Sequence, residues 1–561
     1  MKVSEIPYVR VDVEEIKKVY EEQTEKILNS KSAAEVLAAR KTLLNAEVEL
    51  TTASSLSYMR WSCNTKDEFY KGEKEYYENQ LPLLSGAQIA YMKAMLQTPF
   101  RAEVEKALPA PIYKSYEVSL KALDERVVDE LREESALVNQ YATFMSEFTV
   151  DFDGKKLPLT LLKKYMDDGD REVRKRAFDA LGATFEQNSE LLDGIYDKLV
   201  KVRTRMAQKM GYKNYVELGY YKMGRLCYNR EMVEKFRENV LNDVVPVVSR
   251  VRKARAEKLG ISDMKLYDYG VCFACGDPEP VLDANGMFNA GREMYREMSK
   301  ETGEFIDMML ENEAFDVLSR EGKWGGGYCT EFPKYKQPFI LANFNGSSGD
   351  VDVLTHEAGH AFASYLAFKN NLDPECPLGM ETAETHSMSM EFFCWKFIDK
   401  FFAGRANDYK YKHLLDSLSF LTYGTVVDAF QHIVYENPDM TPAERNAAWN
   451  DLEAKFRPYL NTNGMRYFEK GTRWQYQMHI YESPFYYIDY CLAQSDALQF
   501  LFASLENYGD AFNRYYKFTS HYGSEFFTDM LKEVGIKSPF EKGALKEVAE
   551  KSEKLLKELE K

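Results

Sequence analysis

The chain has 561 residues, a formal net charge of −16 and 45% hydrophobic residues. Such an acidic protein is not expected to bind nucleic acid or an anionic membrane surface, because both carry negative charge. No apolar run approaches the about 18 residues that a membrane-spanning helix needs, and no signal peptide is visible, so we expect a soluble cytoplasmic protein with reduced cysteines.

Helical periodicity dominates the chain from its amino-terminal part onward. Apolar residues recur at helical spacing in four long segments, which span 13–28, 34–50, 191–210 and 545–559. Between them, Phe148 to Leu157 is typical of a β-hairpin with Asp153-Gly154 at the turn. No linker rich in Gly, Ser or Pro and no internal repeat is found. We therefore predict a mainly α protein.

Two domains are expected. The first is an N-terminal helical lobe over 1–200, which includes the hairpin near 148–158, and the second covers 201–561. Within the second domain, the run from Phe339 to Phe344 is bounded by proline and glycine and is predicted to be a strand.

The pentapeptide His-Glu-Ala-Gly-His at 356–360 lies in the next predicted helix. Asp350 follows a Ser-Ser-Gly loop as a good N-cap. On a helix, His356 and His360 project from one face, where two imidazoles can bind one zinc ion. Glu357 lies beside them, where a carboxylate can take a proton from the attacking water. A metallopeptidase needs this set of residues.

A third zinc ligand is expected downstream, because catalytic zinc usually takes three protein ligands and keeps one position for water. Residues 381–395 are predicted to form a second helix with a dense apolar side. Its candidate ligands are Glu381, Glu384, His386 and Glu391, and spacing alone does not choose among them. Glu384 and Glu391 share a helix face, so one could bind zinc while the other orients a ligand histidine.

These segments resemble the thimet oligopeptidase and oligoendopeptidase F family of zinc metallopeptidases, and the bacterial oligoendopeptidase F branch most of all. The resemblance rests on HEAGH at 356–360, ETHSMSME at 384–391, FQH at 430–432 and PFYYIDY at 484–490. It implies that Glu384 is the third ligand and that Glu391 supports a ligand histidine from behind. It also implies a zincin-like fold with two helical lobes around a deep channel, a small β-sheet beside the active site and one zinc ion per chain.

The same resemblance implies that His479, Tyr487 and Tyr490 face the zinc. Peptide hydrolysis builds negative charge on the carbonyl oxygen, and Tyr and neutral His are suitable donors to it. Tyr481 and Tyr486 of this segment are expected to contact substrate. The active site would then be built from two stretches of the second domain, 325–395 and 471–495.

The predicted strand before the zinc helix is interpreted as an exposed sheet edge that pairs with an extended peptide through backbone hydrogen bonds. The resemblance suggests this use, and it assigns substrate binding to Ala342, Asn343, Phe344 and Asn345.

The sequence thus predicts a zinc-dependent endopeptidase that cuts internal bonds of short unstructured peptides. One alternative is a zinc carboxypeptidase of similar helical build, in which Arg473 could anchor the terminal carboxylate of the substrate. A second alternative is a non-catalytic peptide-binding protein that keeps the fold. The oligomeric state and the cleavage preference are left open.

Overall fold

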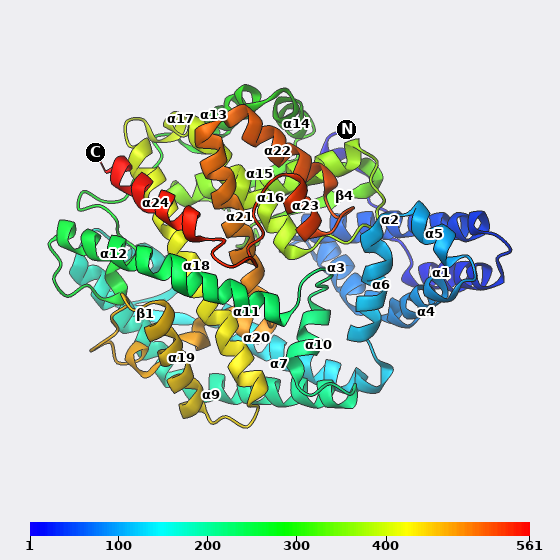
Figure 1. Cartoon of the computed structure of the whole chain (residues 1–561), viewed down its shortest axis with the longest axis horizontal. Coiled ribbons are helices and arrows are strands. Elements are labelled where there is room, and N and C mark those ends of the chain that lie inside the picture. Colours follow the sequence, from blue (N-terminus) through cyan, green and yellow to red (C-terminus); the bar gives the residue numbers. More distant parts are fainter. Residues whose placement is uncertain (561) are drawn as a thin grey trace. The chain divides into compact units, whose positions relative to one another are not determined.

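The chain folds as two units, each assembled from three separated segments, in a computed structural model that describes residues 1–560 (Figure 1). Unit 1 comprises Met1–Leu123, Glu279–Ala406 and Asp496–Lys537. Unit 2 comprises Asp124–Pro278, Asn407–Ser495 and Ser538–Lys561. The predicted mainly α class with only small sheets is confirmed. Within residues 1–560, no helix is both long and apolar enough to cross a bilayer.

The predicted domain boundary between residues 200 and 201 lies inside a continuous helix, α9 (Arg171–Lys209). Asp170 caps the start of this helix by accepting a hydrogen bond from the backbone of Glu172. Apolar residues along its whole length are buried, so nothing separates its two ends into different units. The contacts divide the chain at residue 123 instead, and later segments return to each unit.

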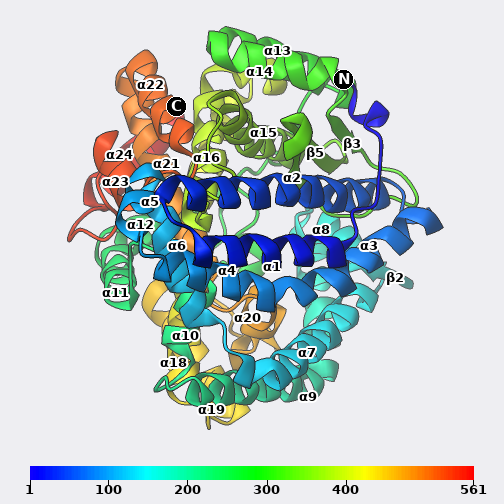
Figure 2. The ribbon, with the colours of Figure 1, turned by 90° about the vertical axis from the view of Figure 1, so that its right-hand side faces the viewer.

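Unit 1 begins with two long helices that pack side by side, α1 and α2 (Figure 2). They confirm the predicted helices at 13–28 and 34–50, although α2 continues to Cys63. Asp12 and Ser32 cap the two helices by accepting backbone hydrogen bonds. The α-helices of unit 1 are α1 (Val13–Asn29), α2 (Ala33–Cys63), α3 (Glu68–Gln80), α4 (Ser85–Gln97), α5 (Arg101–Ala107), α6 (Ala110–Ala122), α13 (Ala284–Met298), α14 (Lys300–Glu311), α15 (Ser348–Lys369), α16 (Met380–Phe393), α17 (Asp399–Phe402), α22 (Tyr508–His521) and α23 (Phe527–Glu533).

A three-stranded sheet in unit 1 has the order β3-β5-β4. Its strands are β3 (Phe315–Leu318), β4 (Tyr328–Phe332) and β5 (Gln337–Phe344). β5 is parallel to β3, with Phe315 opposite Ile340, and antiparallel to β4, with Cys329 also opposite Ile340. The predicted strand is therefore confirmed, and it occupies the centre of the sheet.

Unit 2 is built around the long helices α9 and α18, with the predicted hairpin as its only sheet within the described residues 1–560. Strands β1 (Thr149–Phe152) and β2 (Lys155–Pro158) pair antiparallel, and Asp153 and Gly154 both have positive φ in the turn. The α-helices of unit 2 are α7 (Val128–Glu147), α8 (Leu159–Met166), α9, α10 (Tyr215–Lys222), α11 (Arg230–Asn239), α12 (Val245–Leu259), α18 (Ala406–Glu436, from its second residue), α19 (Pro442–Phe456), α20 (Met478–Glu482), the first part of α21 (Tyr487–Glu506) and α24 (Lys546–Leu559).

Candidate active site

The start of α15 differs from the sequence prediction. Ser347, not Asp350, is the N-cap residue, and Asp350 stands in the first turn of the helix. The buried Asp350 carboxylate folds back and accepts hydrogen bonds from the backbone N–H groups of Asn345 and Gly346. An acidic residue in a first helical turn also interacts favourably with the helix dipole. Asp350 therefore connects the end of β5 to the start of α15.

α15 and α16 bring together the predicted metal ligands. His356, His360 and Glu384 offer ligand atoms that all lie within 4.8 Å of one another. The Oε2 atom of Glu384 is 3.4 Å from His356 Nε2 and 3.7 Å from His360 Nε2. Tetrahedral zinc with bonds of about 2.0–2.1 Å needs donors separated by about 3.4 Å. The donor types and spacing thus fit a zinc ion.

The side chain of Glu391 supports His356 from the opposite side of the ring. Its Oε1 atom lies 2.6 Å from His356 Nδ1. A neutral imidazole that donates from Nδ1 to this carboxylate presents a bare Nε2 toward Glu384. Glu391 lies two helical turns from Glu384 on the same face of α16.

The carboxylates at the site differ in their protonation chemistry. Burial raises the pKa of Glu357, partly opposed by His356 and by a backbone hydrogen bond from Cys329 on β4. Burial acts in the same direction on Glu384, but His356, His360 and the Ser387 hydroxyl outweigh it and hold the pKa of Glu384 below its usual value. Glu384 is therefore ionised at neutral pH, whereas Glu357 has an increased affinity for protons.

Gly359 explains how the second helix approaches so closely, and sequence reasoning missed it. A Cβ atom at this position would lie 2.6 Å from the Cα atom of Ser387 and 2.7 Å from the carbonyl oxygen of His386. Only glycine permits this approach of the α16 backbone to α15. The position of this glycine between the two histidines of the motif could have indicated a close helix contact.

The other candidate ligands do not join the cluster. His386 is fully buried, and its ring packs against Phe518 and stacks with Tyr522. Glu381 is buried one turn before Glu384, where its carboxylate accepts a hydrogen bond from Thr382. Two residues of helix rotate His386 by about 200° from the face that carries Glu384. Glu381 lies near that face, but its carboxylate is not among the clustered ligand atoms.

His479, Tyr486, Tyr487 and Tyr490 lie together in unit 2. The ring of His479 is 4.9 Å from that of Tyr487 and 6.3 Å from that of Tyr490, between ring centroids. The hydroxyl groups of Tyr486 and Tyr490 are 2.7 Å apart. Burial lowers the pKa of His479, so its imidazole is neutral at neutral pH. This cluster therefore gathers neutral hydrogen-bond donors.

A strained residue, Phe485, precedes these tyrosines. Its φ of +67° is unusual for a bulky side chain. The backbone N–H of Phe485 donates to Gln431 Oε1 at 2.9 Å, and its carbonyl accepts from Arg225 Nη2 at 2.6 Å. A Cβ atom on Gly219 would meet the phenyl ring at 2.6 Å. These contacts hold the turn that leads into α21 in one conformation.

The predicted substrate edge on β5 is wrong, because β5 is paired on both sides. Ala342 and Phe344 are buried, and Asn343 donates hydrogen bonds to the carbonyl groups of Trp324 and Gly326. The Asn345 amide is bonded to Asp350. The unbroken burial of Gln337 to Ala342 is typical of a central strand rather than an edge. The edge strands of this three-stranded sheet are β3 and β4.

Tyr481 is also not a substrate contact. It is fully buried in unit 2, and its ring stacks on Tyr141 with a centroid separation of 3.9 Å. Its hydroxyl donates to the Leu192 carbonyl, and its own carbonyl accepts from Arg203. Tyr481 is a core residue, and Tyr486 is only partly buried.

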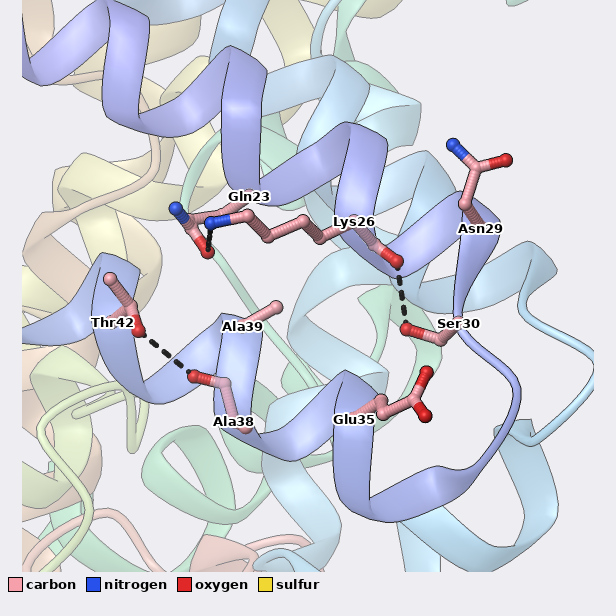
Figure 3. A pocket seen from close by; sticks show the side chains of 8 residues that line it. All are labelled: Gln23, Lys26, Asn29, Ser30, Glu35, Ala38, Ala39 and Thr42. Carbon is pink, nitrogen blue, oxygen red and sulfur yellow. Dashed lines mark hydrogen bonds between the residues drawn. The ribbon is translucent and has the colours of Figure 1, made fainter.

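A pocket of about 430 Å³ lies between α1 and α2 in unit 1. Figure 3 shows its polar lining, where the Lys26 ammonium group donates to Gln23 and the Ser30 hydroxyl donates to the Lys26 carbonyl oxygen. None of the metal-site residues lines this pocket, and its own hydrogen bonds join side chains and backbone groups of the same helix or its cap. It therefore contributes nothing to the candidate active site.

The chain also matches known protein families and solved structures. Residues 3–123 match the Peptidase M3 N-terminal domain, and residues 164–273 and 294–550 match Peptidase family M3. The chain is similar to a solved structure of Pz peptidase A with an inhibitor, with a TM-score of 0.93, 41% identity and 99% of each chain covered. It is also similar to a putative oligoendopeptidase F from Bacillus anthracis str. Ames, with a TM-score of 0.88, 39% identity, and 100% of this chain and 98% of that chain covered.

Among curated proteins, oligopeptidase PepF from Bacillus subtilis (strain 168) is 24% identical over 450 residues, which are 77% of this chain and 64% of PepF. The chain thus spans somewhat less than two thirds of that relative. The first family match ends at residue 123, where the first segment of unit 1 also ends. Together, the two family matches cover most of the sequence and include every residue of the metal cluster and of the histidine–tyrosine cluster. The chain therefore belongs to peptidase family M3.

Proposed function

We propose that this protein is a zinc-dependent endopeptidase acting on short, unstructured peptides. The observation that carries the proposal is the cluster of His356, His360 and Glu384, with Glu357 on the same helix and Glu391 behind His356. The oligoendopeptidase names of several relatives support internal cleavage. Neither the chain's charge nor its helices suggest a nucleic acid or a membrane as partner.

One zinc ion would be held by His356, His360 and Glu384. When bound, zinc supplies Lewis-acid activation of water and of the scissile carbonyl group. Burial lowers the pKa of His360 to about 4, so this ligand stays neutral and able to bind a metal near pH 7. The Glu391 carboxylate orients His356 through Nδ1.

Glu357 is the proposed general base. Its carboxylate takes a proton from the attacking water and then passes it to the leaving amine. The raised pKa of Glu357, which burial causes, suits both steps because the carboxylate must accept a proton and release it within one turnover.

His479, Tyr487 and Tyr490 are the proposed donors to the carbonyl oxygen as it becomes negative. Removal of one oxyanion donor in other peptide-hydrolysing enzymes costs about 2.7–4 kcal/mol. Tyr486 is retained as a substrate contact, because it is partly exposed and its hydroxyl pairs with that of Tyr490.

The substrate backbone is proposed to pair with β4 in place of β5. One side of β4 has no strand partner among residues 1–560, and Cys329 of β4 contributes a backbone hydrogen bond to Glu357. A peptide that adds to this edge would be held through main-chain groups and would tolerate many side chains.

The test is mass spectrometry of a peptide mixture of graded length, digested by the wild type and by Glu357→Gln. The expected result is internal cleavage of short peptides by the wild type. The variant should keep its zinc and lose about 10²–10⁴-fold in kcat. Glu311→Gln is the matched control, because it makes the same change at the exposed end of α14. Wild-type kcat in Glu357→Gln would overturn the mechanism.

Stepwise loss of residues from the carboxyl end would instead favour a carboxypeptidase. The structure offers little support for that alternative, because Arg473, its candidate anchor, is paired with Glu453 at 3.1 Å and lies over the ring of Tyr423. A zinc-loaded protein that cleaves no peptide would favour a peptide-binding protein.

A further inference from the structure

Three side chains form a hydrogen-bonded chain that ends on His479 in unit 2. The Tyr423 hydroxyl, on α18, lies 2.7 Å from Gln477 Oε1, and Gln477 Nε2 lies 2.7 Å from His479 Nδ1. Gln477 is the N-cap residue of the short helix α20, and His479 is the second residue of that helix. Gln477 therefore connects a long helix of unit 2 to the imidazole.

Two cations determine which groups donate and which accept in this series of hydrogen bonds. The guanidinium groups of Arg473 and Arg457 lie 4.6 and 5.2 Å from the centroid of the Tyr423 ring. Nearby positive charge stabilises electron density on the phenol oxygen and makes its O–H a better donor. Tyr423 therefore donates to the carbonyl oxygen of Gln477, and the amide NH₂ group of Gln477 faces Nδ1 of His479.

This direction determines which nitrogen of His479 carries the proton. An Nδ1 atom that accepts a hydrogen bond has no proton of its own in the neutral imidazole, so the proton is on Nε2. The structure describes no hydrogen bond from Nε2 to any of residues 1–560. His479 thus keeps one N–H donor that no group of the described chain uses.

We propose that Gln477 is a positioning residue that holds His479 in the Nε2–H tautomer, so that the imidazole always has a donor for the substrate carbonyl. The inference rests on the proposed role of His479 in catalysis. A glutamine suits this purpose better than a carboxylate, because a carboxylate would accept the proton from Nδ1 and select the opposite tautomer.

The first test observes the tautomer directly. Long-range ¹H–¹⁵N NMR of the zinc-loaded protein, labelled with ¹⁵N-histidine, distinguishes protonated from unprotonated ring nitrogens. The signals of His479 are identified by their loss in His479→Phe, which is practical because the chain has only 7 histidines. We expect Nδ1 to be unprotonated at pH 7, and a proton on Nδ1 would overturn the proposal.

The second test uses Gln477→Glu, which has nearly the same shape. In this variant Nδ1–H donates to the new carboxylate, so deprotonation of the imidazolium removes the proton from Nε2. We expect a new alkaline limb in the pH profile of kcat. Along it kcat should fall by about 10²-fold or more, because the Nε2–H donor is lost. The titratable groups against the ring are Tyr486, Tyr487 and Tyr490. Burial raises the pKa of Tyr487 well above its usual value, so that group stays protonated in the assay.

Matched variants separate this effect from general damage. Gln208→Glu places the same charge on the exposed end of α9 and should leave the pH profile unchanged. His479→Phe with Gln477→Glu should show no alkaline limb beyond that of His479→Phe alone, because the titrating ring is gone. A limb that persists in the double variant contradicts the positioning role. If His479→Phe keeps the wild-type kcat, the catalytic role of His479 fails, whereas the NMR result still decides whether Gln477 sets the tautomer.

Discussion

His432 shows at the scale of one residue how the fold sets protonation in unit 2. Its Nε2 atom lies 3.1 Å from the Tyr220 hydroxyl, and its Nδ1 atom lies 3.0 Å from an Arg237 nitrogen. Arg237 also pairs with the Asp428 carboxylate at 2.6 Å. Burial lowers the pKa of His432 to about 4, and the attraction of Asp428 does not offset it. The imidazole is therefore neutral in the folded protein, with its Nδ1 atom also 2.9 Å from the Asp428 carbonyl oxygen.

This shift predicts how stability depends on pH. An unfolded histidine has a pKa of about 6.5. Below about pH 6.5 the unfolded chain therefore binds a proton at this residue, whereas folded His432 stays unprotonated until the pH approaches 4. The folded-state pKa is depressed, and stability therefore falls as pH decreases from 6.5 toward 4. We expect this residue to contribute a loss of about 2 kcal/mol between pH 7 and 5.

The measurement is urea unfolding of the wild type and of His432→Gln at pH 7 and pH 5. The variant should start less stable, because it leaves part of a buried network unpaired. It should also lose less stability on acidification than the wild type. Equal losses in both proteins would show that His432 does not carry this pH dependence.

At the scale of elements, the crossing of α15 and α16 creates the metal cluster. The proposed ligands come from two helices, and the distance from Glu384 to His356 and His360 depends on how closely these helices approach. Gly359 permits the approach. The Tyr515 hydroxyl on α22 fixes the α16 backbone at the same point by donating to the His386 carbonyl oxygen at 2.8 Å.

Gly359→Ala should therefore weaken zinc binding without touching a ligand. The new methyl group would lie under 3 Å from backbone atoms of Ser387 and His386, so α16 must move and carry Glu384 away. Displacements of this kind typically cost about 1–3 kcal/mol, which corresponds to a zinc dissociation constant about 5–160 times larger. Competition with a metal-chelating dye measures this constant.

Gly349→Ala is the matched control for this prediction. It makes the same change in the first turn of the same helix, where a Cβ atom would meet only the Ser347 hydroxyl at an ordinary 3.4 Å. Zinc affinity should remain at the wild-type value there. Unchanged affinity in Gly359→Ala as well would mean that the helix crossing does not control the site.

At the scale of the whole molecule, removal of zinc should abolish activity and leave the helices intact. The cluster lies between helices that also pack through apolar and backbone contacts, so the ion is not needed to form them. Bound zinc stabilises the folded state by mass action, by about 2.7 kcal/mol when free zinc is at 100 times its dissociation constant.

Dialysis against a chelator, followed by circular dichroism and calorimetry, tests this expectation. The far-ultraviolet spectrum should be unchanged, the Tm should fall, and added zinc should restore both Tm and peptide cleavage. Full activity after complete metal removal would contradict the metallopeptidase mechanism.

Local patterns predicted much of the fold and part of the site. Helical periodicity located α1, α15 and α24, and Asp153-Gly154 located the hairpin, because both signals depend on neighbours in sequence. The sequence pattern failed for the predicted edge at Ala342 and for Tyr481. The neighbouring strand β4 covers one side of β5 and the earlier strand β3 covers the other, a pairing that the residues of β5 do not encode by themselves. Tyr481 is buried against Tyr141, a partner that is distant in sequence.

The sequence by itself determined that two imidazoles and a carboxylate share one helix, because a spacing of four residues places His356 and His360 on the same face of any α-helix. Only the tertiary structure selected Glu384 from four candidates by geometry, since that selection depends on the approach of α16 at Gly359. It alone revealed the chain from Tyr423 through Gln477 to His479, because Tyr423 and Gln477 are 54 residues apart and only packing joins them. Short-range order is encoded in local spacing, whereas the third ligand and the orientation of the imidazole depend on contacts between distant segments.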